Sequence, residues 1–206
     1  MQKIIARSVL VMAALGAWCQ SAYADPGPNL LGNAGFESPA YTGFGRFRQG
    51  HTIGLCGAGA LASNPQPGCW TVQSGSVDVT RPGAIPAHSG SQYMDLNGTG
   101  SGFIAQQVVA APGLAYELTF FGRSSRNQAM TVNASIYWYN AAGSIISTSV
   151  ILAAQTSSAA WTKFRVETAS PTGTAYARIY LRSMTQLLAP YAGYGPLVDT
   201  VVFRTY

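Results

Sequence analysis

Short blocks rich in β-branched and aromatic residues recur along the chain, separated by turn residues such as Arg81-Pro82-Gly83 and Pro112-Gly113. Each block has the length of a β-strand, and no stretch combines a helical period with caps. Many short strands with regular turns indicate an all-β sandwich or jelly roll. The predicted strands are Thr71–Val79, Gln92–Asn97, Phe103–Val109, Ala115–Arg123, Thr131–Tyr139, Ile145–Leu152, Trp161–Thr168, Thr174–Arg182 and Leu197–Arg204.

Alternation within three of these strands places aromatic rings and arginines on the side away from the core. In Thr174–Arg182, small and aliphatic residues alternate with large polar ones, the latter being Tyr176, Arg178, Tyr180 and Arg182. The same period turns Tyr137 and Tyr139 outward, and Phe121 and Arg123 in a third strand. Rings stack on the apolar face of a pyranose, and guanidinium groups donate hydrogen bonds to hydroxyls. An exposed sheet of this kind suits a sugar ligand.

The first 24 residues have the pattern of a signal peptide. Lys3 and Arg7 form a basic start, Ser8–Trp18 is almost wholly apolar, and Ala22-Tyr23-Ala24 suits cleavage before Asp25. The apolar run is too short to cross a bilayer of roughly 30 Å. Cys19 raises the alternative of a lipid anchor, but a bulky tryptophan precedes it. We therefore expect a secreted or periplasmic protein whose residues 25–206 form one domain.

The charge of the chain is low and scattered. Only 9% of residues are charged, the net charge is +5, and no run of lysines or arginines occurs. The basic balance reflects a shortage of acids rather than a nucleic-acid surface. We expect no nucleic-acid partner, no membrane contact and a monomer.

Two cysteines remain after the predicted leader, Cys56 and Cys69. An even pair in an exported chain predicts one disulfide, which would close the Gly- and Pro-rich loop 57–68. Two unpaired thiols are the alternative. A metal site is disfavoured because no second Cys or His lies nearby at ligand spacing.

Three groups of motifs resemble known families. Asn29–Glu37 resembles the N-terminal signature of galactose-binding-like sandwiches, which include carbohydrate-binding modules of the family 4/9 type. Motifs similar to the extracellular domain-of-unknown-function 642 family are Trp70–Val79, His88–Gly90, Tyr93–Gly98 and Ile104–Gln107. Motifs similar to the C-terminal half of the family 4/9 modules are Tyr139–Gly143, Trp161, Tyr176–Arg178 and Leu197–Val201. The resemblance implies a galactose-binding-like jelly roll that binds a polysaccharide or glycan.

The resemblance also implies a structural calcium ion that ties the first strand to the last. Carried over by position, its ligands would be Glu37, Asp199 and the carbonyl of Gly35. Calcium accepts six to eight hard oxygens, which carboxylates and carbonyls supply. The alternative is that Glu37 and Asp199 are surface acids in turns. Thr200 stands where many relatives have an acid or Asn, which leaves the coordination number open.

For the sugar, the resemblance points to the concave sheet or the loops at its rim. We expect three rings to stack on the ligand, those of Phe103, Tyr137 and Tyr180. We expect three side chains to donate hydrogen bonds to it, those of Gln106, Arg123 and Arg182. Ordinary packing beneath loops is the alternative for each ring.

Two other classes of function stay open beside a binding module: an extracellular structural or adhesive sandwich, and a polysaccharide hydrolase. Glycoside hydrolysis needs two carboxylates roughly 5–10 Å apart across the bond. Glu117 and Glu167 are the candidates, and both lie on predicted strands where pairing with arginine is the simpler role. Neither His51 nor His88 lies in a hydrolase motif. We therefore expect a binding protein with no catalytic residue.

Overall fold

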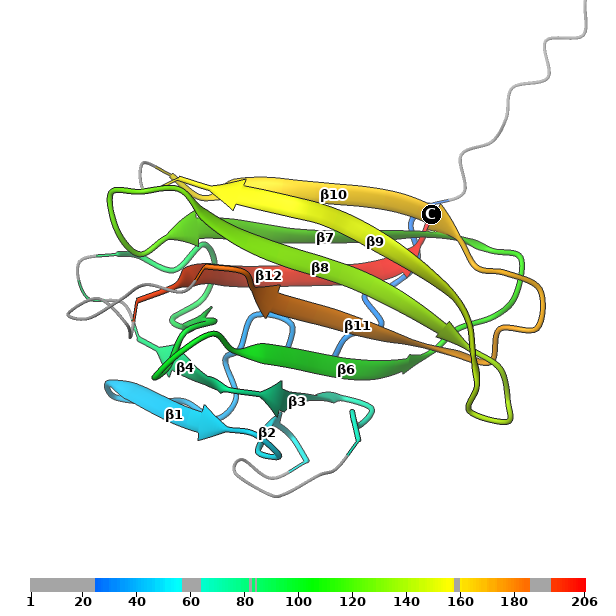
Figure 1. The fold of residues 1–206 in the computed structure, drawn as a ribbon, viewed down its shortest axis with the longest axis horizontal. Coiled ribbons are helices and arrows are strands. Elements are labelled where there is room, and N and C mark those ends of the chain that lie inside the picture. Colours follow the sequence, from blue (N-terminus) through cyan, green and yellow to red (C-terminus); the bar gives the residue numbers. More distant parts are fainter. Residues whose placement is uncertain (1–24, 57–63, 82, 84, 158–159, 186–193) are drawn as a thin grey trace, which may run out of the picture.

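The computed structural model describes residues 25–56, 64–81, 83, 85–157, 160–185 and 194–206. These residues form two six-stranded antiparallel sheets, packed as a sandwich (Figure 1). The predicted all-β sandwich is confirmed. The predicted signal peptide, residues 1–24, lies outside the described residues. Within the described ranges no helix is long and apolar enough to cross a membrane.

The first sheet has the strand order β1-β4-β5-β12-β7-β10. Its strands are β1 (Phe44–Arg48), β4 (Ser76–Thr80), β5 (Tyr93–Asp95), β12 (Pro196–Thr205), β7 (Ala115–Ser124) and β10 (Thr162–Ala169). The second sheet has the order β2-β3-β6-β11-β8-β9. Its strands are β2 (Thr52–Gly54), β3 (Cys69–Ser74), β6 (Phe103–Val109), β11 (Tyr176–Ser183), β8 (Met130–Tyr139) and β9 (Ile145–Thr156).

The core lies between the two sheets and is built by the period-2 alternation of each strand. Ala177, Ile179 and Leu181 of β11 belong to it, as do Leu118 and Phe120 of β7. Because successive side chains of a strand point to opposite sides, the residues between them must lie on the outer faces. The alternation predicted for these strands is confirmed.

The prediction of one strand over Thr71–Val79 is wrong. This segment forms parts of two strands, β3 and β4, which lie in different sheets. Gly75 lies between them with a φ of +65°. A Cβ on Gly75 would lie 2.1 Å from the carbonyl oxygen of Ser101, so no side chain fits there. The glycine therefore lets the chain pass from one sheet to the other. Strands β1 and β2 were not predicted.

The segment that precedes β1 is fixed along the last strand. The backbone N–H groups of Gly27 and Leu30 donate to carbonyls of β12, at 2.9 and 2.8 Å. The Asn29 side chain donates to the Val201 carbonyl and accepts from the Phe203 N–H, both at 2.9 Å. These hydrogen bonds hold the N-terminal segment along β12, so the residues that follow Asn29 lie near Asp199.

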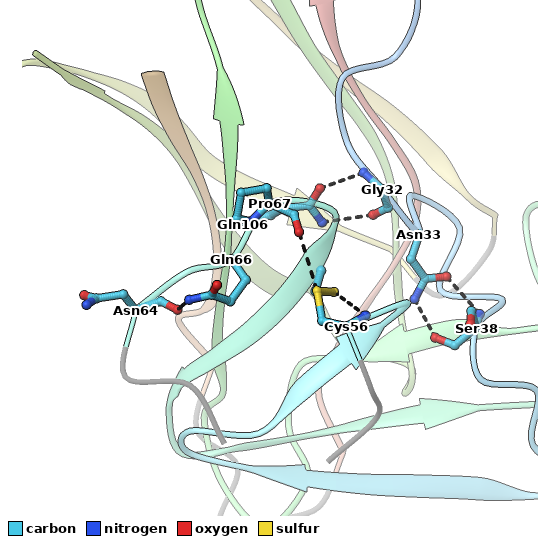
Figure 2. Close-up of a disulfide and its surroundings, with 9 residues drawn as sticks. Gly32, Asn33, Ser38, Cys56, Asn64, Gln66, Pro67 and Gln106 are labelled. Atoms are coloured by element: carbon cyan, nitrogen blue, oxygen red, sulfur yellow. Dashed lines mark hydrogen bonds between the residues drawn. A yellow bond between two sulfur atoms is a disulfide. The ribbon is translucent and has the colours of Figure 1, made fainter. Parts of the chain in front are cut away.

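The predicted disulfide between Cys56 and Cys69 is confirmed, with its Cα atoms 6.0 Å apart. It joins the end of β2 to the start of β3 (Figure 2). Beside it, the Gln106 side chain holds both backbone polar groups of Gly32 (Figure 2).

Candidate functional site

The outer side of the second sheet carries aromatic side chains on three neighbouring strands. Strands β6, β11 and β8 are adjacent, so Arg182 lies opposite Phe103 and Arg178 lies opposite Tyr137. We call this surface the aromatic face. Its rings are those of Phe103, Tyr137, Tyr139, Tyr176 and Tyr180.

The rings of the aromatic face pack against one another around Tyr180. The Tyr180 ring centroid is 5.2 Å from that of Phe103 and 4.7 Å from that of Tyr137. Tyr139 and Tyr176 stack nearly parallel at 4.8 Å. Tyr180 is only 7% exposed, whereas Phe103 and Tyr137 are half-buried. Tyr180 therefore supports the two rings that reach the solvent, and the prediction that its own ring stacks on the ligand is wrong.

The hydroxyl of Tyr180 is kept neutral by its surroundings. Burial raises its pKa, and a hydrogen bond with the Tyr139 hydroxyl, at 3.4 Å, raises it further. A neutral phenol both donates and accepts hydrogen bonds. Tyr180 therefore brings no charge of its own to the aromatic face.

Two arginines complete the aromatic face. The Arg182 guanidinium carbon lies 5.8 Å from the Phe103 ring centroid, and its side chain is exposed. No hydrogen bond or ion pair to this guanidinium is found within the described residues, so its donors face the solvent. Arg178 lies over Tyr139 at 4.6 Å and donates from Nε to the Gln107 side chain at 3.1 Å. The arrangement combines flat rings with planar donors, which are able to contact C–H faces and hydroxyl groups.

Four of the six predicted sugar contacts therefore lie together: Phe103, Tyr137, Tyr180 and Arg182. Arg178 and Tyr176 also belong to this surface, although the sequence did not single them out as contacts. The period-2 alternation that turns Tyr180 outward also turns Tyr176 and Arg178 outward, so the sequence already indicated that they share this surface.

The prediction for Gln106 is wrong. Its side chain points into the sandwich beside Ile104 and Val108, and it is fully buried. Its amide oxygen accepts from the Gly32 N–H at 2.6 Å, and its amide nitrogen donates to the Gly32 carbonyl at 2.9 Å. Gln106 thus fixes the N-terminal segment and has no polar group left for a ligand.

The prediction for Arg123 is wrong about its location. Arg123 is on β7, in the first sheet, so it lies on the opposite side of the sandwich from the aromatic face. It faces the neighbourhood of Tyr93, whose pKa it lowers against the raising effect of burial. Any ligand contact of Arg123 would belong to a different site.

The three residues predicted to bind calcium come together where the N-terminal segment meets β12. A Cβ on Gly35 would lie 3.7 Å from Oδ1 of Asp199 and 3.8 Å from Cγ of Glu37. Glu37 accepts from the backbone of Ser91 and Gln92, at 2.9 and 3.0 Å. Asp199 accepts from the backbone of the same loop, at His88 and Ser89. One loop thus holds both carboxylates.

The surroundings of Asp199 fit a cation. Asp199 is fully buried, and no Lys or Arg pairs with it in the described part of the chain. Burial raises its pKa, although hydrogen bonds from the backbone of Ser89, Thr200 and His88 lower it. Buried carboxylates are normally paired or bound to a metal. A calcium ion here would need backbone or hydroxyl oxygens as well, since the described residues hold no cluster of three His, Cys, Asp or Glu side chains suited to a metal.

The backbone around this site is strained. Phe36 has a φ of +60° and Thr200 a φ of +49°, and each is next to a predicted calcium ligand. Positive φ is rare for a bulky or β-branched residue and costs about 1–3 kcal/mol. Strain of this kind persists where the surrounding structure holds a site in place.

The two candidate acids for hydrolysis lie on the outer side of the first sheet and are engaged by arginines. Glu117 accepts from Arg165 at 2.7 Å and is also paired with Arg204. Burial raises the pKa of Glu117, but the hydrogen bonds from Arg204 and Arg165 outweigh it, so the pKa is lowered. Glu167 pairs with Arg165 and accepts from the Tyr206 hydroxyl at 2.9 Å. Both acids thus have the charge-paired role predicted as the simpler one.

Solved structures with a similar fold were found. A domain of tailspike protein 4 of bacteriophage CBA120 matches 86% of this chain at 14% identity, with a TM-score of 0.50. The chain spans only 21% of that protein's domain. The CBM22-1 xylan-binding domain of Paenibacillus barcinonensis Xyn10C matches 69% of this chain and is covered over 89% of its own length. Its identity is 17% and its TM-score 0.50.

No family model matches this chain, and no curated protein does. At identities this low, the likeness to solved structures establishes a shared sandwich fold.

Proposed function

We propose that this protein is an exported carbohydrate-binding protein that holds a polysaccharide or glycan against its aromatic face. The observation that carries the proposal is the packing of Phe103 and Tyr137 on either side of Tyr180. Because each of these half-buried rings already packs against Tyr180, little side-chain freedom is lost when a ligand stacks on it. A likeness in fold to a xylan-binding domain is in keeping with this role.

In this proposal each side chain has a distinct task. Phe103 and Tyr137 stack on the C–H faces of sugar rings. Arg182 donates hydrogen bonds to hydroxyls through its free guanidinium. Tyr180 holds the two stacking rings in position and is itself a minor contact.

We also propose that calcium binds at Glu37, Asp199 and the Gly35 carbonyl. The ion would neutralise the buried Asp199 carboxylate and join the N-terminal segment to β12. Support comes from the proximity of the three residues, the absence of a cationic partner for Asp199 among the described residues, and the strained backbone beside it. The disulfide between Cys56 and Cys69 supports export to an oxidising compartment.

A screen of immobilised plant and microbial polysaccharides tests the proposed function. We expect binding to at least one polysaccharide, and about tenfold weaker binding by Phe103→Ala, the equivalent of roughly 1.4 kcal/mol. Val109→Ala is the matched control, because Val109 is on the same side of β6 and is 82% exposed. No binding to any glycan would favour the structural or adhesive alternative. Turnover of a bound glycan, lost in Glu117→Gln, would favour the hydrolase.

A further inference from the structure

A groove lies on the outer side of the first sheet, on the opposite side of the sandwich from the aromatic face. Its volume is about 480 Å³, and its lining includes Phe44, Arg46, Asp78, Tyr93, Asp95 and Tyr194. Sites for small molecules enclose roughly 300–1,000 Å³. The groove is therefore large enough for a small ligand.

The floor of the groove is a row of polar residues in register across neighbouring strands. Arg46 on β1 lies opposite Asp78 on β4, which lies opposite Asp95 on β5. The Arg46 guanidinium donates from Nε and Nη2 to the two oxygens of Asp78, both at 2.8 Å. This pairing fixes planar donors and acceptors side by side. Asp95, by contrast, forms no ion pair within the described residues, although the charge of Arg46 lowers its pKa.

Asp95 is an unusual side chain for the floor of a groove. It is only 8% exposed, and its Oδ1 accepts from the backbone N–H of Asn97 at 2.8 Å. Burial raises its pKa to about 8, and the neighbouring charge of Asp78 adds to the rise. Near neutral pH its carboxyl is therefore mainly protonated, and such a group can donate a hydrogen bond as well as accept one.

Aromatic rings stand beside this polar floor. Phe44, on the edge strand β1, is 62% exposed, and the Arg46 guanidinium lies 5.5 Å from its ring centroid. Tyr194 is 39% exposed, and Arg126 lies 3.5 Å over its ring. Exposed rings next to paired donors and acceptors match a ligand that has C–H faces and several hydroxyls.

From this geometry we infer a second carbohydrate site, separate from the aromatic face, that takes one sugar residue at a chain end or a free mono- or disaccharide. The sugar hydroxyls would meet the Arg46–Asp78 pair and Asp95, and its C–H face would lie against the exposed ring of Phe44. A neutral polyol fits better than a cation, because Arg46 already neutralises Asp78 and places a positive charge in the groove. The limited volume favours a short ligand over the length of a polymer.

This inference does not depend on the proposed function of the aromatic face. If both sites bind, one molecule presents sugar-binding surfaces on two opposite sides and can join two glycan chains. If only the groove binds, the protein recognises small sugars or chain ends alone.

Titration of the full mature chain with neutral sugars, followed by amide chemical shifts, tests the groove. The probes are xylose, glucose, galactose and mannose with their β-1,4-linked disaccharides, at millimolar concentration. We expect saturable shifts in β1, β4 and β5 for at least one sugar. Phe44→Ala should weaken this binding at least about fivefold, in the range for losing one aromatic contact. Ile145→Ala, an exposed apolar residue on the edge strand of the other sheet, should leave it unchanged.

Three results would overturn the second site: no saturable shift in the groove with any sugar, equal affinity for native protein and Phe44→Ala, or saturable shifts there with calcium but with no sugar. A Phe103→Ala variant separates this test from that of the proposed function. It should bind polysaccharide about tenfold more weakly at the aromatic face and keep the sugar-induced shifts in β4 and β5.

Discussion

The two outer faces of the sandwich are built from opposite kinds of contact. On the second sheet, rings pack on rings, and the arginines lie over the rings rather than beside acids. On the first sheet, acids and arginines form ion pairs, including Arg46–Asp78 and the Glu117 pairs with Arg165 and Arg204. Exposed aromatic rings alone therefore do not define a site. A ligand can bind only where hydrogen-bond donors and rings remain free of contacts within the protein itself.

The largest expected effect comes from breaking the connection between the two sheets. Gly75→Ala places a Cβ against the Ser101 carbonyl at a φ of +65°, so we expect a loss of about 3 kcal/mol or more in unfolding free energy. Urea denaturation measures it. Gly113→Ala is the matched control, since Gly113 also has a positive φ but no atom near its Cβ position. A cost of about 1–2 kcal/mol is expected there, and equal costs would refute the steric explanation.

The outer face of the first sheet should respond to pH through Asp95, whereas the aromatic face should not, because strands β6, β8 and β11 carry no carboxyl side chain. Its pKa is about 8 in the folded protein, against roughly 4 in an unfolded chain. The folded state therefore holds the proton more tightly. The contribution of Asp95 protonation to folding stability is complete below about pH 4 and is lost as the pH rises to about 8. Melting temperatures across this range should fall more for native protein than for Asp95→Asn.

The groups that face Asp95 are shared by both proteins in that experiment. They are Asp78 on β4, Arg46 on β1 and Tyr93 on β5, and Arg123 on β7 lies farther along the same row, beyond Leu197 of β12. The difference between native protein and Asp95→Asn therefore isolates Asp95. Parallel curves would mean that Asp95 is ionised in the folded state across the whole range.

Calcium removal tests the junction between the N-terminal segment and the first sheet. We expect chelation to lower the melting temperature by several degrees, because an ion that binds only the folded state stabilises it by mass action, here by about 2–3 kcal/mol. Asp199→Asn should abolish the response to chelator. An unchanged melting temperature in excess chelator would contradict calcium binding at this site.

The smallest effect should come from the hydroxyl at the centre of the aromatic face. Tyr180→Phe removes a long hydrogen bond to Tyr139 but keeps the ring that supports Phe103 and Tyr137. We expect a change in unfolding free energy within about 0.5 kcal/mol, measured by denaturant titration. A loss above about 2 kcal/mol would mean that hydrogen bonding, rather than ring packing, maintains this face.

The strands of the fold were predictable because their alternation is local. Each strand from β6 to β12 was found at or near its bounds, and the outward direction of Tyr137 and Tyr180 followed from the same period. The break at Gly75 was missed, since a glycine between two β-rich segments does not reveal that its φ is positive. Strand β1 was missed because its charged and glycine residues do not alternate cleanly.

The candidate sites were predictable only in part, for reasons of topology. Gln106 alternates in phase with Ile104 and Val108, so its inward direction could have been inferred from the sequence. The location of Arg123 could not have been inferred, because the residues of a strand do not indicate which of the two sheets that strand joins. The groove depends on the register among β1, β4 and β5, which brings Arg46, Asp78 and Asp95 into one row only in the folded chain.

The most direct test of sugar binding at the aromatic face is calorimetric titration with the polysaccharide selected by the screen. The comparison is between native protein, the double variant Phe103→Ala/Tyr137→Ala and the groove variant Phe44→Ala. We predict that the double variant loses affinity by more than about tenfold while still unfolding in one cooperative transition. We predict that Phe44→Ala binds this polymer within about twofold of native protein. Equal affinity of the native protein and the double variant would contradict sugar binding at the aromatic face.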